Sequence, residues 1–218
     1  MKRSFVILAL FSLSIAINVY CGTLKDLRDG KTYRTVKIGD QEWMAENLNK
    51  KIDLCCLDFP EDLSYRNERF KVFTVGSWCY ENKASNCKKY GRLYTWMAAL
   101  DACPIGWHLP NKWEFETLIN TIGNWGNTGK MLKSKKGWSE GGNGIDAVSF
   151  TALPAGRFIN FDDAHFINKG DFAFFWSASE GGLGHAFLMR LDYNDEYADL
   201  KQFNKTDAFS VRCVKDSE

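Results

Sequence analysis

The number and spacing of the cysteines constrain this chain more than any other feature of its sequence. It has seven cysteines, and six of them follow Cys21. In an exported protein an even set of this kind is typical of disulfide bonds, whereas in a reducing compartment it favours metal binding or catalysis. The cellular compartment therefore decides which chemistry to expect. The six are Cys55, Cys56, Cys79, Cys87, Cys103 and Cys213.

The N-terminus has the layout of a secretory signal peptide. Lys2 and Arg3 precede an apolar run from Phe5 to Ile17. A basic start and an apolar run of this length are typical of a signal peptide, whereas a helix needs about 20 apolar residues to cross a bilayer. We predict that residues 1–21 direct export and that the mature chain has no transmembrane span. The alternative is a buried first helix.

The cleavage site has two interpretations. Cleavage before Cys21 would leave that cysteine as the first mature residue, which is lipidated in bacterial lipoproteins. Such signals usually have small residues before the cysteine, whereas Tyr20 stands here. Cleavage after Ser14-Ile15-Ala16 fits the small-x-small pattern of ordinary signal peptidase sites. We expect an extracellular or outer-surface protein, with soluble secretion slightly favoured over lipid anchoring at Cys21.

The cysteine spacing suggests two bridges in an exported chain. Cys79 and Cys87 flank a short polar stretch, so a bond between them would close a local loop. A bond between Cys103 and Cys213 would close a long one, which contributes ~4–5 kcal/mol in the chain-entropy model. Zinc is the competing interpretation, but the chain has no Cys-x-x-Cys pair and its three histidines lie far apart. We predict no metal.

Charge and composition exclude several classes of partner. The formal net charge is +1, so no long-range field draws the chain to nucleic acid. Hydrophobic residues make up 45% of the chain, which is too apolar for a disordered protein. The 16 Phe, 8 Trp and 8 Tyr can fill a large aromatic core. The composition predicts a globular domain that does not bind nucleic acid.

Apolar periodicity predicts two helices. The first would end at Pro104. The second would begin at Asn111, whose side chain forms a capping box with Glu114, and would stop at Gly123 in a left-handed conformation. The apolar positions at helical spacing are Tyr90, Leu93, Trp96, Met97, Leu100 and Cys103 in the first and Phe115, Leu118, Ile119 and Ile122 in the second.

Alternating patterns predict several strands. Val36 and Ile38 alternate with polar residues before a Gly39-Asp40 turn, which indicates a hairpin that ends at Met44. In the last strand, odd-numbered positions would face one side of a sheet and even-numbered positions the other. Helices followed by strands predict an α+β fold. The further strands are expected at residues 148–153, 172–177, 185–193 and 208–214.

Two segments lack regular periodicity. Seven glycines lie between Gly123 and Gly144, which predicts a long loop region. Residues 51–76 have mixed charge and no clear period, so we interpret them as an irregular insertion. They hold Cys55 and Cys56, which are adjacent and could bond to each other only with strain. Other partners or a free thiol remain open for this pair.

Six motifs in order are similar to the Fibrobacter succinogenes major paralogous domain, a family of exported bacterial surface proteins. The resemblance runs from about residue 26 to residue 216 and implies a single domain over residues 22–218. The insertion looks longer than the usual family spacer. The motifs are EWMAENLN (42–49), YGRLYTW (90–96), CPIGWHLP (103–110), FTALPAG (150–156), FWSASE (175–180) and SVRCVKD (210–216).

More distantly, the layout resembles C-type-lectin-like folds, including the branch that contains formylglycine-generating enzymes. In these folds a cysteine of the first helix pairs with one on the final strand, which implies a Cys103–Cys213 bond here. The resemblance implies an α+β fold with a C-type-lectin-like core, two amphipathic helices, short antiparallel strands and a long Gly/Trp-rich loop region. A fold does not imply a function.

Two groups of residues are candidates for ligand binding. Asp192, Asn194 and Asp195 belong to an acidic cluster that could supply oxygen atoms to calcium. Only Asn194-Asp195 matches part of a lectin-like calcium motif, so we predict a solvated hairpin tip and no cofactor, with calcium as the alternative. The loop aromatics could stack on sugar rings, since loops run over the surface. These aromatics are Trp125, Trp138 and Phe161, whereas Trp176 is expected in the core.

The chain shows no catalytic motif. It has no Gly-x-Ser-x-Gly elbow, no His-Glu-x-x-His helix and no phosphate loop. A formylglycine-type oxidase would need two reactive cysteines in the C-terminal half, where only Cys213 stands. We expect a non-catalytic binding or adhesion module whose partner is a carbohydrate or another surface component. The alternatives are a lectin-fold enzyme and a structural envelope protein.

Overall fold

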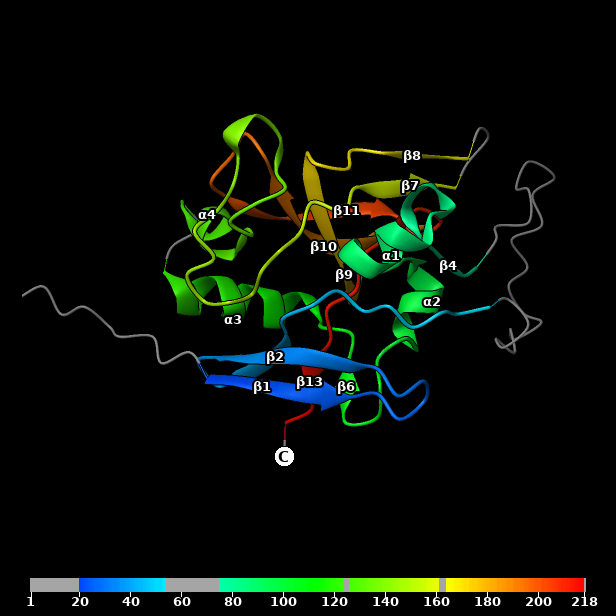
Figure 1. Ribbon diagram of the computed structural model, residues 1–218, viewed down its shortest axis with the longest axis horizontal. Helices are drawn as coiled ribbons and strands as arrows, with labels where there is room; N and C mark the ends of the chain where they lie inside the picture. Colours follow the sequence, from blue (N-terminus) through cyan, green and yellow to red (C-terminus); the bar gives the residue numbers. More distant parts are fainter. Residues whose placement is uncertain (1–19, 54–74, 124–125, 161–163, 218) are drawn as a thin grey trace, which may run out of the picture.

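The computed structural model describes residues 20–53, 75–123, 126–160 and 164–217 (Figure 1). Residues 1–19 of the predicted signal segment, Cys55 and Cys56 of the insertion, and two of the candidate aromatics, Trp125 and Phe161, lie outside these residues. The chain forms mainly antiparallel sheets and four α-helices within the described ranges, which confirms the mixed α+β prediction. No helix in those ranges is long and apolar enough to cross a membrane.

The strands form three antiparallel sheets. The first has the order β1 (Tyr20–Lys25), β2 (Thr32–Ile38), β3 (Gln41–Met44), β13 (Val214–Lys215), β6 (Trp107–His108). The second has the order β11 (Ala198–Asn204), β10 (His185–Asp192), β9 (Phe172–Glu180). The third has the order β4 (Ser77–Trp78), β5 (Leu93–Thr95), β12 (Ala208–Phe209), β7 (Arg157–Ile159), β8 (His165–Ile167).

Local sequence signals are confirmed where they act over short distances. Ile38 pairs with Gln41 across a turn in which Gly39 has φ of 60°, as the Gly-Asp signal predicted. The helix α3 (Lys112–Ile122) begins with both hydrogen bonds of the Asn111–Glu114 capping box. Gly123 follows it with φ of 159°, so the helix ends there without the expected left-handed stop. β9 and β10 confirm two more of the predicted segments.

The helix predicted over residues 90–103 is wrong over its first half. α1 (Ala84–Tyr90) ends before Gly91, whose φ of 73° breaks the helical path. Leu93–Thr95 then form β5, and all three side chains are buried, whereas one face of an amphipathic helix would be exposed. Beyond Tyr90, the last residue of α1, only α2 (Trp96–Leu100) is helical within the predicted span. Sheet pairing with β4 and β12 outweighs the helical spacing.

Two predicted strands are also corrected. Residues 148–153 form no strand, because Ser149 and Thr151 adopt φ of 56° and 53°. Residues 208–214 split between β12 and β13, which belong to different sheets. Ser210 and Arg212 are therefore buried like their odd-numbered neighbours. The glycine-rich region also contains a short helix, α4 (Thr128–Leu132).

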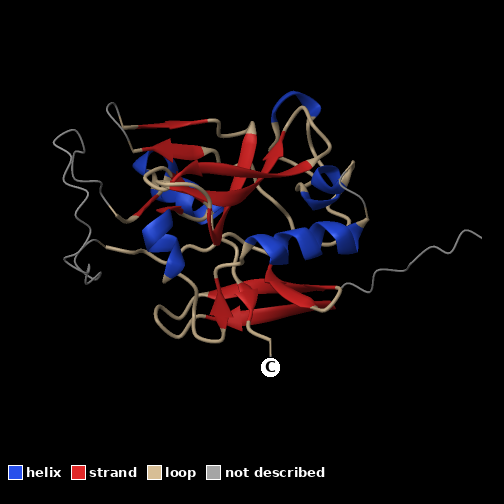
Figure 2. Cartoon of the chain, turned by 180° about the vertical axis from the view of Figure 1, so that it is seen from behind, coloured by secondary structure: helices blue, strands red, loops and turns tan. Residues whose placement is uncertain are grey.

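The second sheet has a core cluster on each face. Phe175 and Met189 face α3 and the first sheet, so α3 packs between two sheets, as the opposite views in Figures 1 and 2 show. Phe174 and Trp176 face α2 and β12 on the other side. Trp176 is fully buried, which confirms its predicted place in the core.

Candidate functional site

The glycine-rich region and the turn between β10 and β11 line a pocket of about 420 Å³, which we call the loop–hairpin pocket. The two regions are separate in the sequence, and the structure brings them together. The turn contributes two of the predicted ligand-binding residues, Asn194 and Asp195, whereas Asp192 lies just outside the lining. The lining residues are Lys130, Lys133, Glu140, Gly141, Gly142, Asn143, Tyr193, Asn194, Asp195 and Glu196.

Glycines in this region permit direct contact between the loop and the hairpin. A Cβ added to Gly142 would lie 2.0 Å from the carbonyl oxygen of Tyr193, and one added to Gly129 would lie 2.0 Å from that of Tyr197. Real Cβ atoms do not approach backbone oxygens so closely. Packing therefore requires glycine at these two positions, where the backbone of the loop lies directly against the backbone of the hairpin turn.

Lys133 places a positive charge inside the β10–β11 turn. Its side chain is buried, and its Nζ donates hydrogen bonds of 2.8 Å to the carbonyl oxygens of Asp192 and Asp195. Nζ also lies 5.1 Å from the centroid of the Trp138 ring. Burial lowers the pKa of Lys133, although the nearby carboxylates oppose this shift. Lys133 was not among the predicted site residues, because a single lysine carries no local signal for burial.

The acidic residues of the turn are engaged in local hydrogen bonds. Oδ1 of Asp192 accepts from the backbone N–H of Asn194, and Oδ1 of Asp195 accepts from the backbone N–H of Tyr197. A calcium ion using the carbonyl groups of this turn would have to displace the Lys133 ammonium. No group of three or more His, Cys, Asp or Glu side chains is placed to hold a metal ion within the described ranges.

The aromatic platform expected at Trp138 is not present. Trp138 is 5% exposed, belongs to the core and donates its indole N–H to Oγ of Ser134 at 3.1 Å. Its ring lies under the loop and closes the core beneath it, so the expectation of an exposed ring at this position is corrected.

Other aromatic side chains are exposed instead. Tyr193 lines the pocket and is half-buried, and Tyr197, next along the turn, is 53% exposed. Trp113 is 67% exposed on the first turn of α3, with Nζ of Lys112 5.0 Å from its ring. The exposure of Trp113 could have been predicted from the sequence, because Trp113 lies off the apolar stripe of that helix.

Both predicted disulfides are present. The Cα atoms of Cys79 and Cys87 are 4.8 Å apart, and those of Cys103 and Cys213 are 5.8 Å apart. The second bond joins the segment after α2 to the chain just before β13. Cys21 lies in β1, opposite Val36, and is an exposed free thiol.

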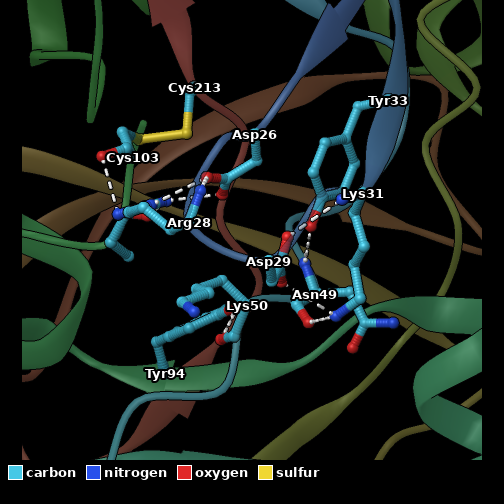
Figure 3. A network of polar contacts seen from close by, with 11 residues as sticks. Asp26, Arg28, Asp29, Lys31, Tyr33, Asn49, Lys50, Tyr94, Cys103 and Cys213 are labelled. Carbon is cyan, nitrogen blue, oxygen red and sulfur yellow. Dashed lines mark hydrogen bonds and ion pairs between the residues drawn. A yellow bond between two sulfur atoms is a disulfide. The ribbon is translucent and has the colours of Figure 1, made fainter. Parts of the chain in front are cut away.

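A polar network holds the β1–β2 turn against the long-range disulfide (Figure 3). Arg28 donates to the carbonyl oxygens of Ala102 and Cys103 at 2.7 and 3.1 Å and forms an ion pair of 2.7 Å with Asp26. Burial of the Asp26 carboxyl raises its pKa, but the bonds from Arg28 outweigh burial and hold the pKa below its usual range. The network anchors the first sheet to the end of α2.

His108 joins three segments through its two ring nitrogens. Nδ1 lies 2.6 Å from Oδ1 of Asp216, and Nε2 lies 2.7 Å from Oε1 of Glu114. Burial lowers the pKa of His108, but the hydrogen bonds to the two carboxylates outweigh it and raise the pKa above 6.5. Because each nitrogen faces a carboxylate, the charged imidazolium fits this position.

Comparison with protein-family models identifies the family of the chain. Residues 36–215 match the model of the Fibrobacter succinogenes major domain, Fib_succ_major. Neither the curated proteins nor the solved structures contain a match to the chain. The matched range covers well over half of the 218 residues and includes the residues of the loop–hairpin pocket and of both disulfides. The chain therefore belongs to the Fibrobacter succinogenes major domain family.

Proposed function

We propose that the protein is an exported, non-catalytic binding module with a C-type-lectin-like core, and that it binds carbohydrate in the loop–hairpin pocket. The observation that carries the proposal is the pocket itself, in which two segments distant in sequence surround about 420 Å³ with polar side chains beside the Tyr193 ring. Pockets of this size fall within the usual range for small ligands.

The side chains of the pocket suit a ligand rich in hydroxyl groups. Glu140, Asn143 and Asn194 are exposed and carry carboxylate and amide groups, which accept from and donate to hydroxyls. The ring of Tyr193 offers an apolar face against which a sugar ring can pack. Alternating hydroxyl and C–H faces are what distinguishes a carbohydrate from a purely apolar or purely charged ligand.

The backbone at Glu140 supports a binding role. Glu140 has φ of 48°, in the left-handed region that non-glycine residues rarely adopt. Its neighbour Ser139 donates from Oγ to Oδ1 of Asp171 at 2.7 Å, which ties the loop to the segment before β9. The left-handed backbone of Glu140 costs about 1–3 kcal/mol, and strain of this kind is concentrated at functional sites, where it fixes the orientation of a side chain.

A glycan array screened with the mature protein tests the proposal. We expect hits whose affinity falls about threefold to tenfold in Glu140→Gln and in Asn194→Ala. The first replaces a charged acceptor oxygen with an NH2 donor, and the second removes the side-chain amide. Glu180→Gln is the matched control, since Glu180 is exposed and lies at the opposite end of the β9–β10 hairpin. Thermal unfolding of each variant checks that the fold is intact.

Three results would overturn the proposal. A blank array with folded protein would reject carbohydrate and favour a structural envelope role. Equal loss in the Glu180→Gln control would place binding outside the pocket. Cleavage or modification of a bound oligosaccharide, detected by mass spectrometry, would favour the lectin-fold enzyme.

Export and anchoring are tested by the mature N-terminus. Cleavage after Ala16 would leave all of β1, which starts at Tyr20, and cleavage before Cys21 would remove only its first residue. Both cuts are therefore compatible with the sheet. Intact mass of the protein from the culture medium and from the membrane fraction distinguishes soluble secretion, the favoured outcome, from a lipid on Cys21.

A further inference from the structure

A second pocket, of about 290 Å³, lies against the first sheet. Its walls come from β2, the segment after β3, the last turn of α1 and the chain at residues 151–153. Four basic side chains line it, against one acidic side chain, that of Glu46. We call it the arginine-backed pocket, because Arg212 bonds to two of its lining residues from behind. The four basic residues are Lys31, Arg34, Lys88 and Lys89.

The floor of this pocket covers a buried guanidinium group. Arg212 is fully buried and donates from Nε to Oδ1 of Asn47 at 2.7 Å and from Nη2 to the carbonyl oxygen of Thr151 at 2.9 Å. Asn47 and Thr151 both line the pocket. The remaining bonds of Arg212 go to the carbonyl oxygens of Met44 and Phe150.

The charge of Arg212 is not neutralised by direct contact. Within the described ranges no carboxylate bonds to its guanidinium, and burial lowers its pKa to about 9, although Asp146 and Glu46 oppose this shift from a distance. A buried charge without a paired opposite charge is costly, and its field extends farther than in water. The cavity next to Asn47 and Thr151 is where an anion would reduce that cost.

Two of the four basic side chains at the rim of the pocket, Lys88 and Lys89, are available to an anion, because the other two are already paired. Lys31 is paired with Asp29 at 3.3 Å and bonds to the backbone at Asn49, as Figure 3 shows, and Arg34 is paired with Glu46 at 2.6 Å. Lys88 and Lys89 are exposed and form no ion pair with any described residue.

The walls that carry these charges are held in place. The Cys79–Cys87 bond fixes α1, and Cys87 itself lines the pocket. At the end of α1, a Cβ added to Gly91 would lie 2.7 Å from Cβ of Asn47, so this turn is in close contact with the floor. The cations of the rim therefore line one cavity from elements that are held in place.

We infer that the arginine-backed pocket binds an oxyanion, a carboxylate or sulfate group on a ligand no larger than about one sugar ring. Its volume is at the small end of the range for ligand pockets. The positive charges of the rim and of Arg212 supply the attraction, since both N–H groups of the Asn47 amide already donate to Tyr90 and Ser210. The group can belong to an acidic sugar or to a free inorganic anion. This site does not depend on carbohydrate binding in the loop–hairpin pocket.

Isothermal titration calorimetry with sodium sulfate, glucuronate and glucose, at constant ionic strength set with sodium chloride, tests the inference. We expect sulfate or glucuronate to bind and neutral glucose to bind at least tenfold more weakly at this site. Binding of glucuronate alone identifies an acidic sugar as the source of the oxyanion, and binding of sulfate alone identifies an inorganic anion.

Variants localise the site. Lys88→Gln with Lys89→Gln should weaken oxyanion binding roughly threefold to tenfold, because two exposed charges near the anion are removed. Lys135→Gln with Lys136→Gln is the matched control, since these lysines are also adjacent and exposed but line neither pocket. Equal affinity for glucose and glucuronate, no binding of either anion, or equal loss in the control would overturn the inference. A loss of glycan-array hits alone would leave it standing.

Discussion

The two disulfides close loops of very different length, and their removal should therefore cost very different amounts of stability. The Cys103–Cys213 bond has a sequence separation of 110 residues and the Cys79–Cys87 bond a separation of 8. In the chain-entropy model the first contributes about 4.8 kcal/mol to the free energy of unfolding and the second about 2.5 kcal/mol. The difference, about 2.3 kcal/mol, depends only on the logarithm of the ratio of the loop lengths.

Paired cysteine-to-alanine variants measure this difference. One variant changes Cys103 and Cys213 and the other changes Cys79 and Cys87, and each pair contains a buried cysteine, Cys213 or Cys87. The cost of lost side-chain burial is thus similar in both, and the comparison isolates loop closure. Urea unfolding followed by tryptophan fluorescence gives the free energy of each variant. Equal losses, or a larger loss for the short loop, would refute the reasoning.

Three further perturbations have defined outcomes. The pKa of His108 is raised above 6.5 in the folded state, so its contribution to stability is full below pH 6.5 and is lost as the pH rises through the folded pKa. Over this pH window the urea midpoint of the wild type should fall by the equivalent of less than about 1 kcal/mol, whereas that of His108→Gln should not. Identical pH profiles of the two proteins would contradict the assignment. Lys133→Met leaves two turn carbonyl groups without their donor and should lower the free energy of unfolding by about 1–3 kcal/mol; unchanged stability in urea would show that the ammonium is dispensable. Gly142→Ala would place a Cβ 2.0 Å from the Tyr193 carbonyl oxygen, so it should destabilise the fold and distort the pocket, whereas Gly182→Ala, with no atom within 4 Å of the added Cβ, should leave the thermal midpoint nearly unchanged.

The family motifs acquire a physical meaning from the buried contacts. The EWMAENLN, YGRLYTW and SVRCVKD segments meet at Asn47, whose amide donates to the carbonyl oxygen of Tyr90 and to Oγ of Ser210 and whose Oδ1 accepts from Arg212. Three stretches far apart in sequence are thus joined by one polar side chain in the core. Buried polar groups must be satisfied, so the three segments depend on one another.

Short-range signals were read correctly from the sequence. The capping box and apolar stripe of α3, the Gly39 turn of the β2–β3 hairpin and the β9 and β10 segments all follow from interactions within a few residues. The disulfide pairs also followed, one from local spacing and one from the resemblance to C-type-lectin-like folds. The helix expected across Gly91 failed because its apolar spacing fits a buried strand equally well, and pairing with β12 decides between them.

The tertiary structure alone decided the sites. The burial of Lys133 and Arg212, the approach of Gly142 to Tyr193 and both pockets depend on contacts between segments tens to more than a hundred residues apart. Periodicity describes which face of one element is apolar, but it does not say which distant carbonyl group will face a lysine. Whether a charged side chain is exposed or buried is settled only when the elements pack, because only then do the partners that offset its desolvation come within hydrogen-bond distance.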